Sequence, residues 1–203
     1  MSIANGYTTL TAFKLRAGIP AGSAHDDDAE RAVEAASRAI DDYCARRFWT
    51  DSVVSARLYT ADDPYRLPVD DFSVTTGLIV KSDDDWDGVY ETTWTLNSRS
   101  GPYGFMVEPA NAVVRGIPFC RLHAVANSFP GDSEGVQVTA LWGWAAVPLP
   151  VVEACLVLAS RYYKRKDTPF GVMGTTETGF VDLPKVDPDV AALLAPYRRL
   201  GWV

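Results

Sequence analysis

The stretch VQVTALWGWAAVPLPVVEACLVLASRYYKRKD (residues 136–167) contains the boundary between the two kinds of secondary structure in this chain. Its first part, 136–144, has the composition of a β-strand, and the prolines of PLP (148–150) end that pattern. Residues 151–167 then follow a helical pattern that is apolar on nearly every side as far as Ala159. A helix without a polar face belongs in the centre of a core or in a contact between subunits.

Helical patterns also precede the strand-rich part of the chain. Residues 9–17 predict a short helix, which Gly18 and Pro20 would end. The acidic run 26–28 then opens a longer helix that we expect to reach Phe48. Its apolar residues recur at intervals of three and four, which places them on one helical face: Ala29, Val33, Ala36, Ile40 and Tyr43.

Strand-like segments, separated by clusters of Gly, Pro, Asp and Asn, fill the chain between the helices. These segments are 54–60, 77–81, 93–97, 119–125 and 136–144. Roughly five or six strands predict a small antiparallel sheet that curls into a sandwich or an open barrel. The predicted fold is therefore α+β, a single domain over 1–203. In it, a helical core from 1–48 and 148–203 carries a β-rich insertion at 49–147.

Composition restricts the functions open to this chain. Its 203 residues have a formal net charge of −7, which argues against a general binder of the nucleic-acid phosphate backbone, because such a binder needs a basic face. The three cysteines form no CxxC pair, so we expect free thiols in a reducing compartment. No segment has the pattern of a signal peptide or the length of a membrane span, so we expect synthesis and assembly in a cytoplasm.

No segment matches a motif for nucleophilic or nucleotide-dependent catalysis, so we predict no catalytic residue, no cofactor and no enzyme. The nearest motif is DDDWDGVYE (83–91), in which Asp83, Asp85 and Asp87 match the opening of a calcium loop, D-x-D-x-D-G. The twelfth position of that loop is Trp94, where a bidentate carboxylate is required. An acidic hairpin with Asp-Gly at its turn is therefore favoured over a metal site.

The stretch DPDVAALLAPYRR (187–199) predicts a short helix near the end of the chain. Asp187 can cap it, Pro188 suits its first position, and its apolar residues share one face. Isolated helices shorter than about 12–15 residues are marginal in water, so this helix needs a surface to lie on. Trp202 follows it, and tryptophan so close to the end of a sequence suggests an anchor for a partner.

The order of these patterns resembles one known family. YCARRFW (43–49), WGW with VP (142–148), YYKRKDTPFG (162–171) and LLAPYRR (193–199) are similar in order and kind to segments of the head–tail connector (adaptor) proteins of long-tailed bacteriophages, particularly those of phages of actinobacteria. The sheet region carries the resemblance through DDDWDGVYETTW. The resemblance implies a structural protein without catalytic residues.

The resemblance also implies an assembly. Proteins of this family form a ring, commonly twelve-fold, beneath the portal protein at the head–tail junction of the virion. The implied partners are the portal protein, the downstream neck or tail protein and further copies of the same chain, while the free chain is compatible with a monomer. DNA would pass through the ring without specific binding, and no membrane is involved.

Two sets of residues acquire roles from this resemblance. The docking residues for the portal or the next neck component would be Val190, Leu193, Leu194, Tyr197, Arg198, Arg199 and Trp202. The residues near a subunit boundary would be Tyr162, Tyr163, Lys164, Arg165 and Lys166.

Alternative interpretations remain open at this stage. Trp142 and Trp144 share one face of a strand, which predicts core filling or a stacking platform for a carbohydrate. A ligand-binding β-module, with a sugar on these tryptophans or calcium on 83–91, is therefore the main alternative function. A stopper or tail-completion role in the same neck is the nearer one.

Overall fold

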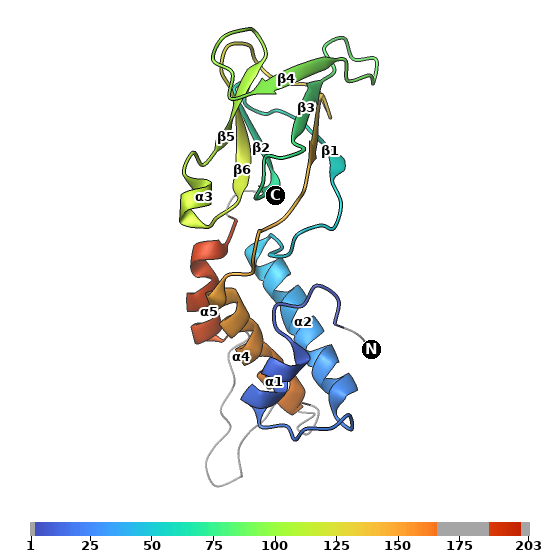
Figure 1. The fold of residues 1–203 in the computed structure, drawn as a ribbon, viewed down its shortest axis with the longest axis vertical. Helices are drawn as coiled ribbons and strands as arrows, with labels where there is room; N and C mark the ends of the chain where they lie inside the picture. Colours follow the sequence, from blue (N-terminus) through green and yellow to red (C-terminus); the bar gives the residue numbers. More distant parts are fainter. Residues whose placement is uncertain (1–2, 166–186, 200–203) are drawn as a thin grey trace. The chain divides into compact units, whose positions relative to one another are not determined.

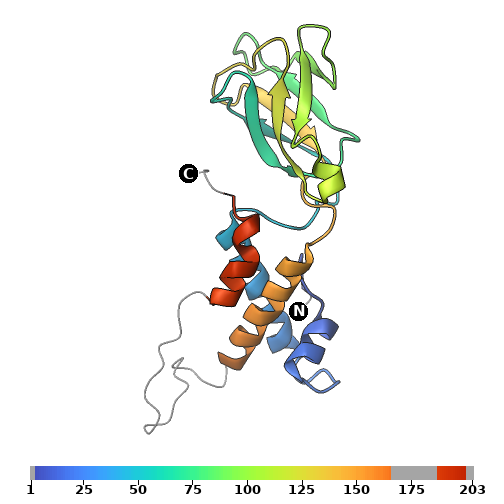
Figure 2. The ribbon, with the colours of Figure 1, turned by 90° about the vertical axis from the view of Figure 1, so that its left-hand side faces the viewer.

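The computed structural model describes residues 3–165 and 187–199. The fold is α+β, as predicted, and it divides into two compact units (Figures 1 and 2). We call Met1–Phe48 with Val147–Val203 the helical unit, and Trp49–Ala146 the β unit. The β unit is one continuous segment, whereas the helical unit is assembled from both ends of the sequence.

The helical unit is built around its longest C-terminal helix. Its described elements are α1 (Leu10–Ala17), α2 (Asp26–Cys44), α4 (Leu149–Arg165), α5 (Pro188–Leu194) and the 3₁₀ helix η1 (Ala195–Tyr197). Because α4 contacts α1, α2 and α5, it is the central helix of this unit (Figure 2). This position explains its all-round apolar pattern without a second subunit. Every helix in the described part of the chain is too short or too polar to cross a membrane.

Local sequence sets the ends of the first two helices. Thr9 caps α1, since its hydroxyl oxygen accepts a hydrogen bond from the N–H of Ala12 at 3.2 Å. α2 ends at Cys44, so the prediction that it reaches Phe48 is wrong. The reason is that Ala45 adopts a left-handed backbone with φ of 50°, which stops the helix. Phe48 is instead a fully buried core residue.

The β unit forms a seven-stranded sheet with the strand order β1-β7-β3-β4-β5-β6-β2. Its elements are β1 (Ser55–Tyr59), β2 (Arg66–Phe72), β3 (Ile79–Ser82), β4 (Thr92–Leu96), β5 (Gly104–Glu108), α3 (Ala112–Arg115), β6 (Phe119–Ala124) and β7 (Val136–Ala140). β4 and β5 pair in parallel, so the prediction of an antiparallel sheet is wrong for this pair. Residues 97–103 connect the two strands by a crossover, which a parallel pair requires.

Two strands, β2 and β5, lie outside the segments that the sequence predicts. β2 contains Pro68, Asp70 and Asp71, residue types that are depleted in strands. Pro68 is tolerated because β2 is an edge strand of the sheet. At an edge, the N–H that proline lacks is not needed for a hydrogen bond to a second neighbouring strand.

Side chains bring the two edge strands of the sheet, β1 and β2, together. Arg57 on β1 forms an ion pair with Asp70 on β2 at 2.6 Å, and the hydroxyl of Tyr59 donates to the same carboxylate at 2.9 Å. A backbone bridge pairs Phe72, at the end of β2, with Trp142, just after β7. The sheet is thereby nearly closed into a barrel, which removes most of the unpaired backbone that an open edge exposes.

The two tryptophans that the sequence left with two interpretations are both buried, and both follow the end of β7 at Ala140, so the prediction that they lie within a strand is wrong. Trp142 and Trp144 are 0% and 3% exposed. The indole N–H of Trp142 donates to the carbonyl oxygen of Ser55 at 2.9 Å, and that of Trp144 donates to the Asp71 carboxylate at 2.9 Å. Core filling is confirmed, and their burial excludes a carbohydrate platform on these two residues.

Gly143→Ala is expected to destabilise the β unit. An alanine Cβ would lie 2.0 Å from the carbonyl oxygen of Trp49, and the φ of Gly143, 115°, is one that L-residues disfavour. Urea unfolding followed by tryptophan fluorescence should show a loss of about 3 kcal/mol or more in the free energy of unfolding. Gly101→Ala is the matched control, because Gly101 has φ of 113° with nothing within 4 Å of the added Cβ. It should lose about 1 kcal/mol, and equal losses would contradict the role of the close contact.

Candidate functional site

The C-terminal helix α5 lies on the chain's own helical unit. Asp187 caps it by accepting the N–H of Asp189 at 3.0 Å, and a proline occupies its first turn, as predicted. α5 contacts α4, and Val190 and Leu194 are 2% and 1% exposed. The expectation that these two side chains dock on a partner is therefore wrong, because α4 supplies the surface that the short helix needs.

The residues after α5 are held against the C-terminal end of α2. The ring of Tyr197 packs edge-on against that of Phe48, with 5.8 Å between the centroids. The guanidinium of Arg198 lies 4.9 Å from the centroid of the Tyr43 ring, a distance typical of a cation–π contact. These contacts hold Tyr197 and Arg198 against the end of α2 within the helical unit.

Part of the predicted docking set still faces outward. Leu193 is half-buried, and Arg198 is exposed beyond its contact with α2. Arg199 is half-buried, and its backbone N–H donates to the carbonyl oxygen of Cys44 at 2.9 Å. Trp202 lies outside the described residues. A docking surface on this segment would therefore consist of its outward residues and not of its apolar face.

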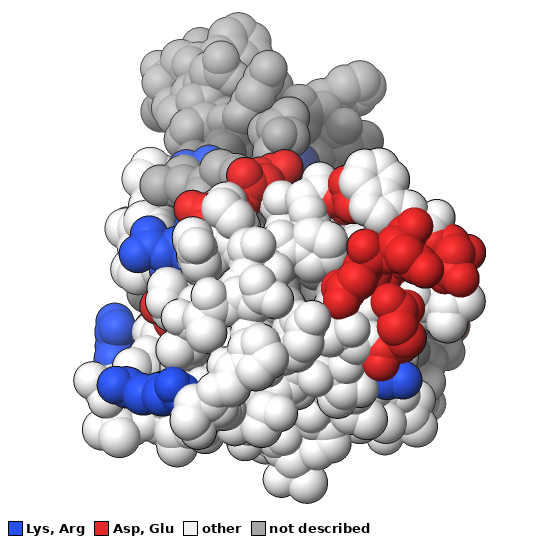
Figure 3. Space-filling model, turned by 90° about the horizontal axis from the view of Figure 1, so that it is seen from above, with Lys and Arg blue, Asp and Glu red and all other residues white. Residues whose placement is uncertain are grey.

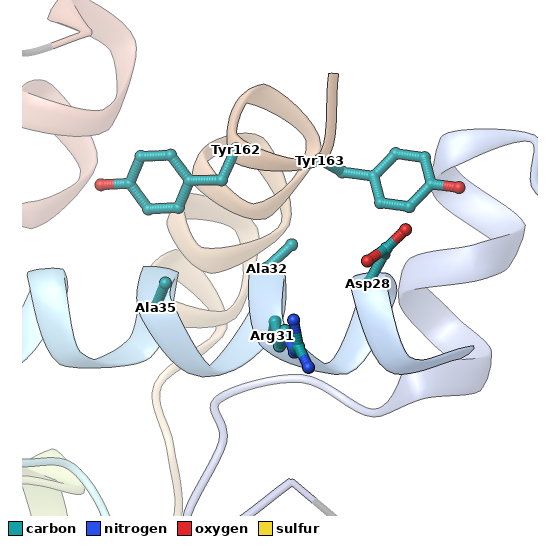
Figure 4. A pocket seen from close by; sticks show the side chains of 6 residues that line it. All are labelled: Asp28, Arg31, Ala32, Ala35, Tyr162 and Tyr163. Atoms are coloured by element: carbon teal, nitrogen blue, oxygen red, sulfur yellow. The ribbon is translucent and has the colours of Figure 1, made fainter. Parts of the chain in front are cut away.

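A shallow pocket of about 200 Å³ lies between α2 and the end of α4 (Figure 4). It is lined by Asp28, Arg31, Ala32, Ala35, Tyr162 and Tyr163. Figure 4 shows that the two tyrosine rings point in opposite directions along α2. The ring of Tyr163 also packs edge-on against that of Phe13 on α1, with 5.9 Å between the centroids. Tyr163 therefore stabilises the helical unit itself, in addition to any contact it makes with a second subunit.

The last described turn of α4 is basic and exposed. Lys164 and Arg165 occupy it, where cations complement the negative end of the helix dipole. Lys166 lies outside the described residues. The role of this turn at a subunit boundary stays a prediction.

The predicted acidic hairpin is present between β3 and β4, which pair in antiparallel register. One carboxylate oxygen of Asp83 accepts the N–H of Trp86 at 2.7 Å, and the other accepts the N–H of Gly88 at 2.8 Å. Desolvation alone would raise the pKa of Asp83, but backbone N–H groups of the loop hold the pKa below its usual value. Acidic side chains gather on one side of the molecule in the view of Figure 3, which looks onto the end that carries this loop.

The same loop brings the candidate metal ligands together. Oxygen atoms of Asp83, Asp85, Asp87 and Glu91 all lie within 4.8 Å of one another. Glu91 is missing from the predicted set, although it stands at the ninth position of the calcium-loop template, a position that often contributes through water. Trp94 at the twelfth position is a buried core residue. Because Asp83 already accepts two backbone N–H groups, the loop satisfies this carboxylate without an ion, and we assign it a structural role.

The fold is shared with proteins of gene transfer agent (GTA) particles. Over 100% of this chain, it matches a chain in the neck of an empty GTA particle, computed with C6 symmetry, with a TM-score of 0.58 and 18% identity over 95% of that chain. A chain of the native GTA virion matches with a TM-score of 0.55 and 18% identity over 95% of its length. A chain in the native GTA neck, computed with C12 symmetry, matches with a TM-score of 0.56 and 17% identity over 94% of its length. No protein-family model and no curated protein matches the sequence.

Asp83→Asn is expected to destabilise the hairpin more than Asp85→Asn, because the Asp83 carboxylate accepts the backbone N–H groups of Trp86 and Gly88. The lowered pKa of Asp83 means that its charge stabilises the fold above the unfolded-state pKa of about 3.9 and that this stabilisation is lost as the pH falls further. The urea midpoints of unfolding of the wild type and both variants, at pH 7 and at pH 3, measure this stabilisation. The difference in midpoint between the wild type and Asp83→Asn should be smaller at pH 3 than at pH 7. A difference that does not depend on pH would contradict the stabilising role of the Asp83 charge.

Proposed function

We propose that this chain is a structural protein of the neck of a tailed phage or phage-like particle. The observation that carries the proposal is the likeness of its full length, both units included, to chains in the necks of GTA particles. The order of its sequence motifs, which resembles that of head–tail connectors, supports the same class. We extend the proposal to neck proteins in general rather than to the actinophage subgroup.

We further infer that copies of the chain form a ring beneath the portal protein. The GTA necks were computed with C6 and C12 symmetry, and this supports a cyclic arrangement, for which twelve copies are our expectation. A formal charge of −7 per chain, repeated around a ring, would repel DNA from the channel wall and let it slide. The ring would extend the DNA channel and join head to tail.

The outward residues of the C-terminal segment are the proposed contact with the portal or with the next neck component. Arg198 is exposed, and its contact with Tyr43 orders the guanidinium before any partner binds. An ordered arginine loses less conformational entropy on binding than a free one, and arginine is among the residues that dominate binding energies. The exposed turn with Lys164 and Arg165 is the proposed subunit boundary.

This role requires no catalysis, no cofactor and no membrane. The described residues contain one cluster of potential metal ligands, the acidic hairpin, and its central carboxylate is satisfied by backbone N–H groups. The protein would be made in the host cytoplasm and reside in the virion at the head–tail junction.

Particles assembled without this chain are expected to accumulate as heads without tails, because the joint between portal and tail would be missing. Adding the purified chain should restore joined particles, and electron microscopy of their necks should show an additional ring beneath the portal. Normal tailed particles formed in the absence of the chain would contradict the proposal.

Arg198→Ala is expected to lower the yield of joined particles by about tenfold, which corresponds to about 1.4 kcal/mol of lost docking energy. The matched control is Arg16→Ala on α1, since Arg16 is also exposed and also has one side-chain partner, Glu153, at 3.6 Å. Both variants should melt within a few degrees of the wild type. If the two variants join heads and tails equally well, the docking role of Arg198 is wrong.

A further inference from the structure

The helical turn α3 presents two valines to solvent. Val113 and Val114 are 73% and 89% exposed, while Ala112 is fully buried and anchors the turn between β5 and β6. Valine is a modest helix former that gains nothing from exposure to water. Single exposed apolar residues are ordinary, but two adjacent and almost fully exposed valines form a protruding apolar site. We call Val113 and Val114 the valine knob.

A second apolar surface lies on the outer face of β1, β7 and β3. The ladder pairs Ala56 with Thr139 and Thr139 with Ile79, and these side chains point away from the barrel interior. Leu58 and Ile79 are 44% and 47% exposed, and Val54 continues the surface at the start of β1. We call these five residues the apolar strand face.

The valine knob and the apolar strand face lie on opposite sides of the β unit. Around the nearly closed barrel, β3 and β4 separate β7 from β5 on one side. On the other side, β1, β2 and β6 separate them. Both surfaces are near the same end of the barrel. β5 runs opposite to β1 and β3, so α3 follows β5 at the end where β1 and β3 begin.

The charges of the β unit follow the same division. Exposed acidic residues of the hairpin, Asp84, Asp85, Asp87 and Glu91, lie on the side of β3. Exposed arginines lie on or next to β2, β5 and β6, and two exposed aspartates precede β2 on the same side: Arg66, Arg99, Arg115, Asp62 and Asp63. In the view of Figure 3, the largest group of acidic side chains lies on one side and most basic side chains lie on the other, while one basic side chain borders the acidic group. Two copies placed side by side in the same orientation would therefore bring an acidic side against a basic side.

We propose that the valine knob of one copy seats on the apolar strand face of the next copy. This inference rests on the proposed function and specifies which surfaces meet in the ring. A contact between two different patches is heterologous, and it closes into a ring when each copy is rotated by a constant angle from the last. The apolar patches supply the buried centre of the contact, and the charged side chains, which include the hairpin at the opposite end of β3, favour one side-to-side arrangement of the copies.

Disulfide trapping tests which surfaces meet. The chain with Val114→Cys and Ile79→Cys, in a Cys120→Ser background, should form a ladder of linked dimers, trimers and larger species under mild oxidation of joined particles that contain it. Cys44 and Cys155 do not compete, because both are buried and burial raises the pKa of Cys44 to about 11. Each single-cysteine chain should stop at a dimer, since one thiol links only two chains.

The control pair is Val114→Cys with Leu15→Cys, because Leu15 is 85% exposed on α1 and belongs to neither patch. We expect the knob–face pair to give at least about fivefold more linked trimer than the control pair, as expected when an apolar contact holds the thiols together. Equal ladders, or no ladder from the knob–face pair, would overturn the inference.

A second measurement separates this inference from the proposed function. Val114→Asp should lower the yield of joined particles by about tenfold, because it places a charge in the centre of the contact, whereas Leu15→Asp should leave the yield within about twofold. Both positions are exposed, so both variants should melt like the wild type. If Val114→Asp assembles normally in particles that do require the chain, the inference fails and the proposed function stands. If particles do not require the chain, both fail.

Discussion

The packing of α2 against α4 is the contact on which the rest of the helical unit depends, because it joins the two ends of the sequence. Small side chains are frequent on the buried faces of both helices, which lets their axes approach closely: Ala29, Ala32, Ala36, Ala154 and Ala159. Between them, the hydroxyl of Ser37 lies 3.5 Å from the sulfur of Cys155 and accepts the backbone N–H of Tyr7 at 3.1 Å. One buried point therefore ties together α2, α4 and the segment before α1.

The β unit depends on a comparable junction, made by the acidic residues of its edge strand β2. Asp70 accepts from Arg57 and Tyr59 on β1, and the neighbouring Asp71 accepts the indole N–H of Trp144. The two carboxylates point to different partners because successive side chains of a strand alternate between its faces. This acidic pair of an edge strand thus draws the barrel together.

The sequence predicts those elements in which a local pattern dominates, and it fails where the deciding partner lies far along the chain. The capped helices and the valine-rich strands are found, but β2 is missed because its carboxylates and Pro68 are explained only by β1 and by its edge position. Periodicity places Val190 and Leu194 on one face of α5, yet no local signal shows that α4 covers that face. The valine knob could not be predicted for another reason. α3 is a single helical turn, which is too short to show a helical period in the sequence.

The discontinuity of the helical unit has a consequence for synthesis on the ribosome. About a hundred residues separate the end of α2 from the start of α4, so at 5–20 residues per second the apolar stripe of α2 waits roughly 5–20 s for its partner. The β unit is continuous and lies within that interval, so it has time to fold while the first helices are still unpaired. The nascent chain therefore exposes this stripe until α4 emerges, and the charged residues of α2, including its acidic first turn, favour solubility over that interval.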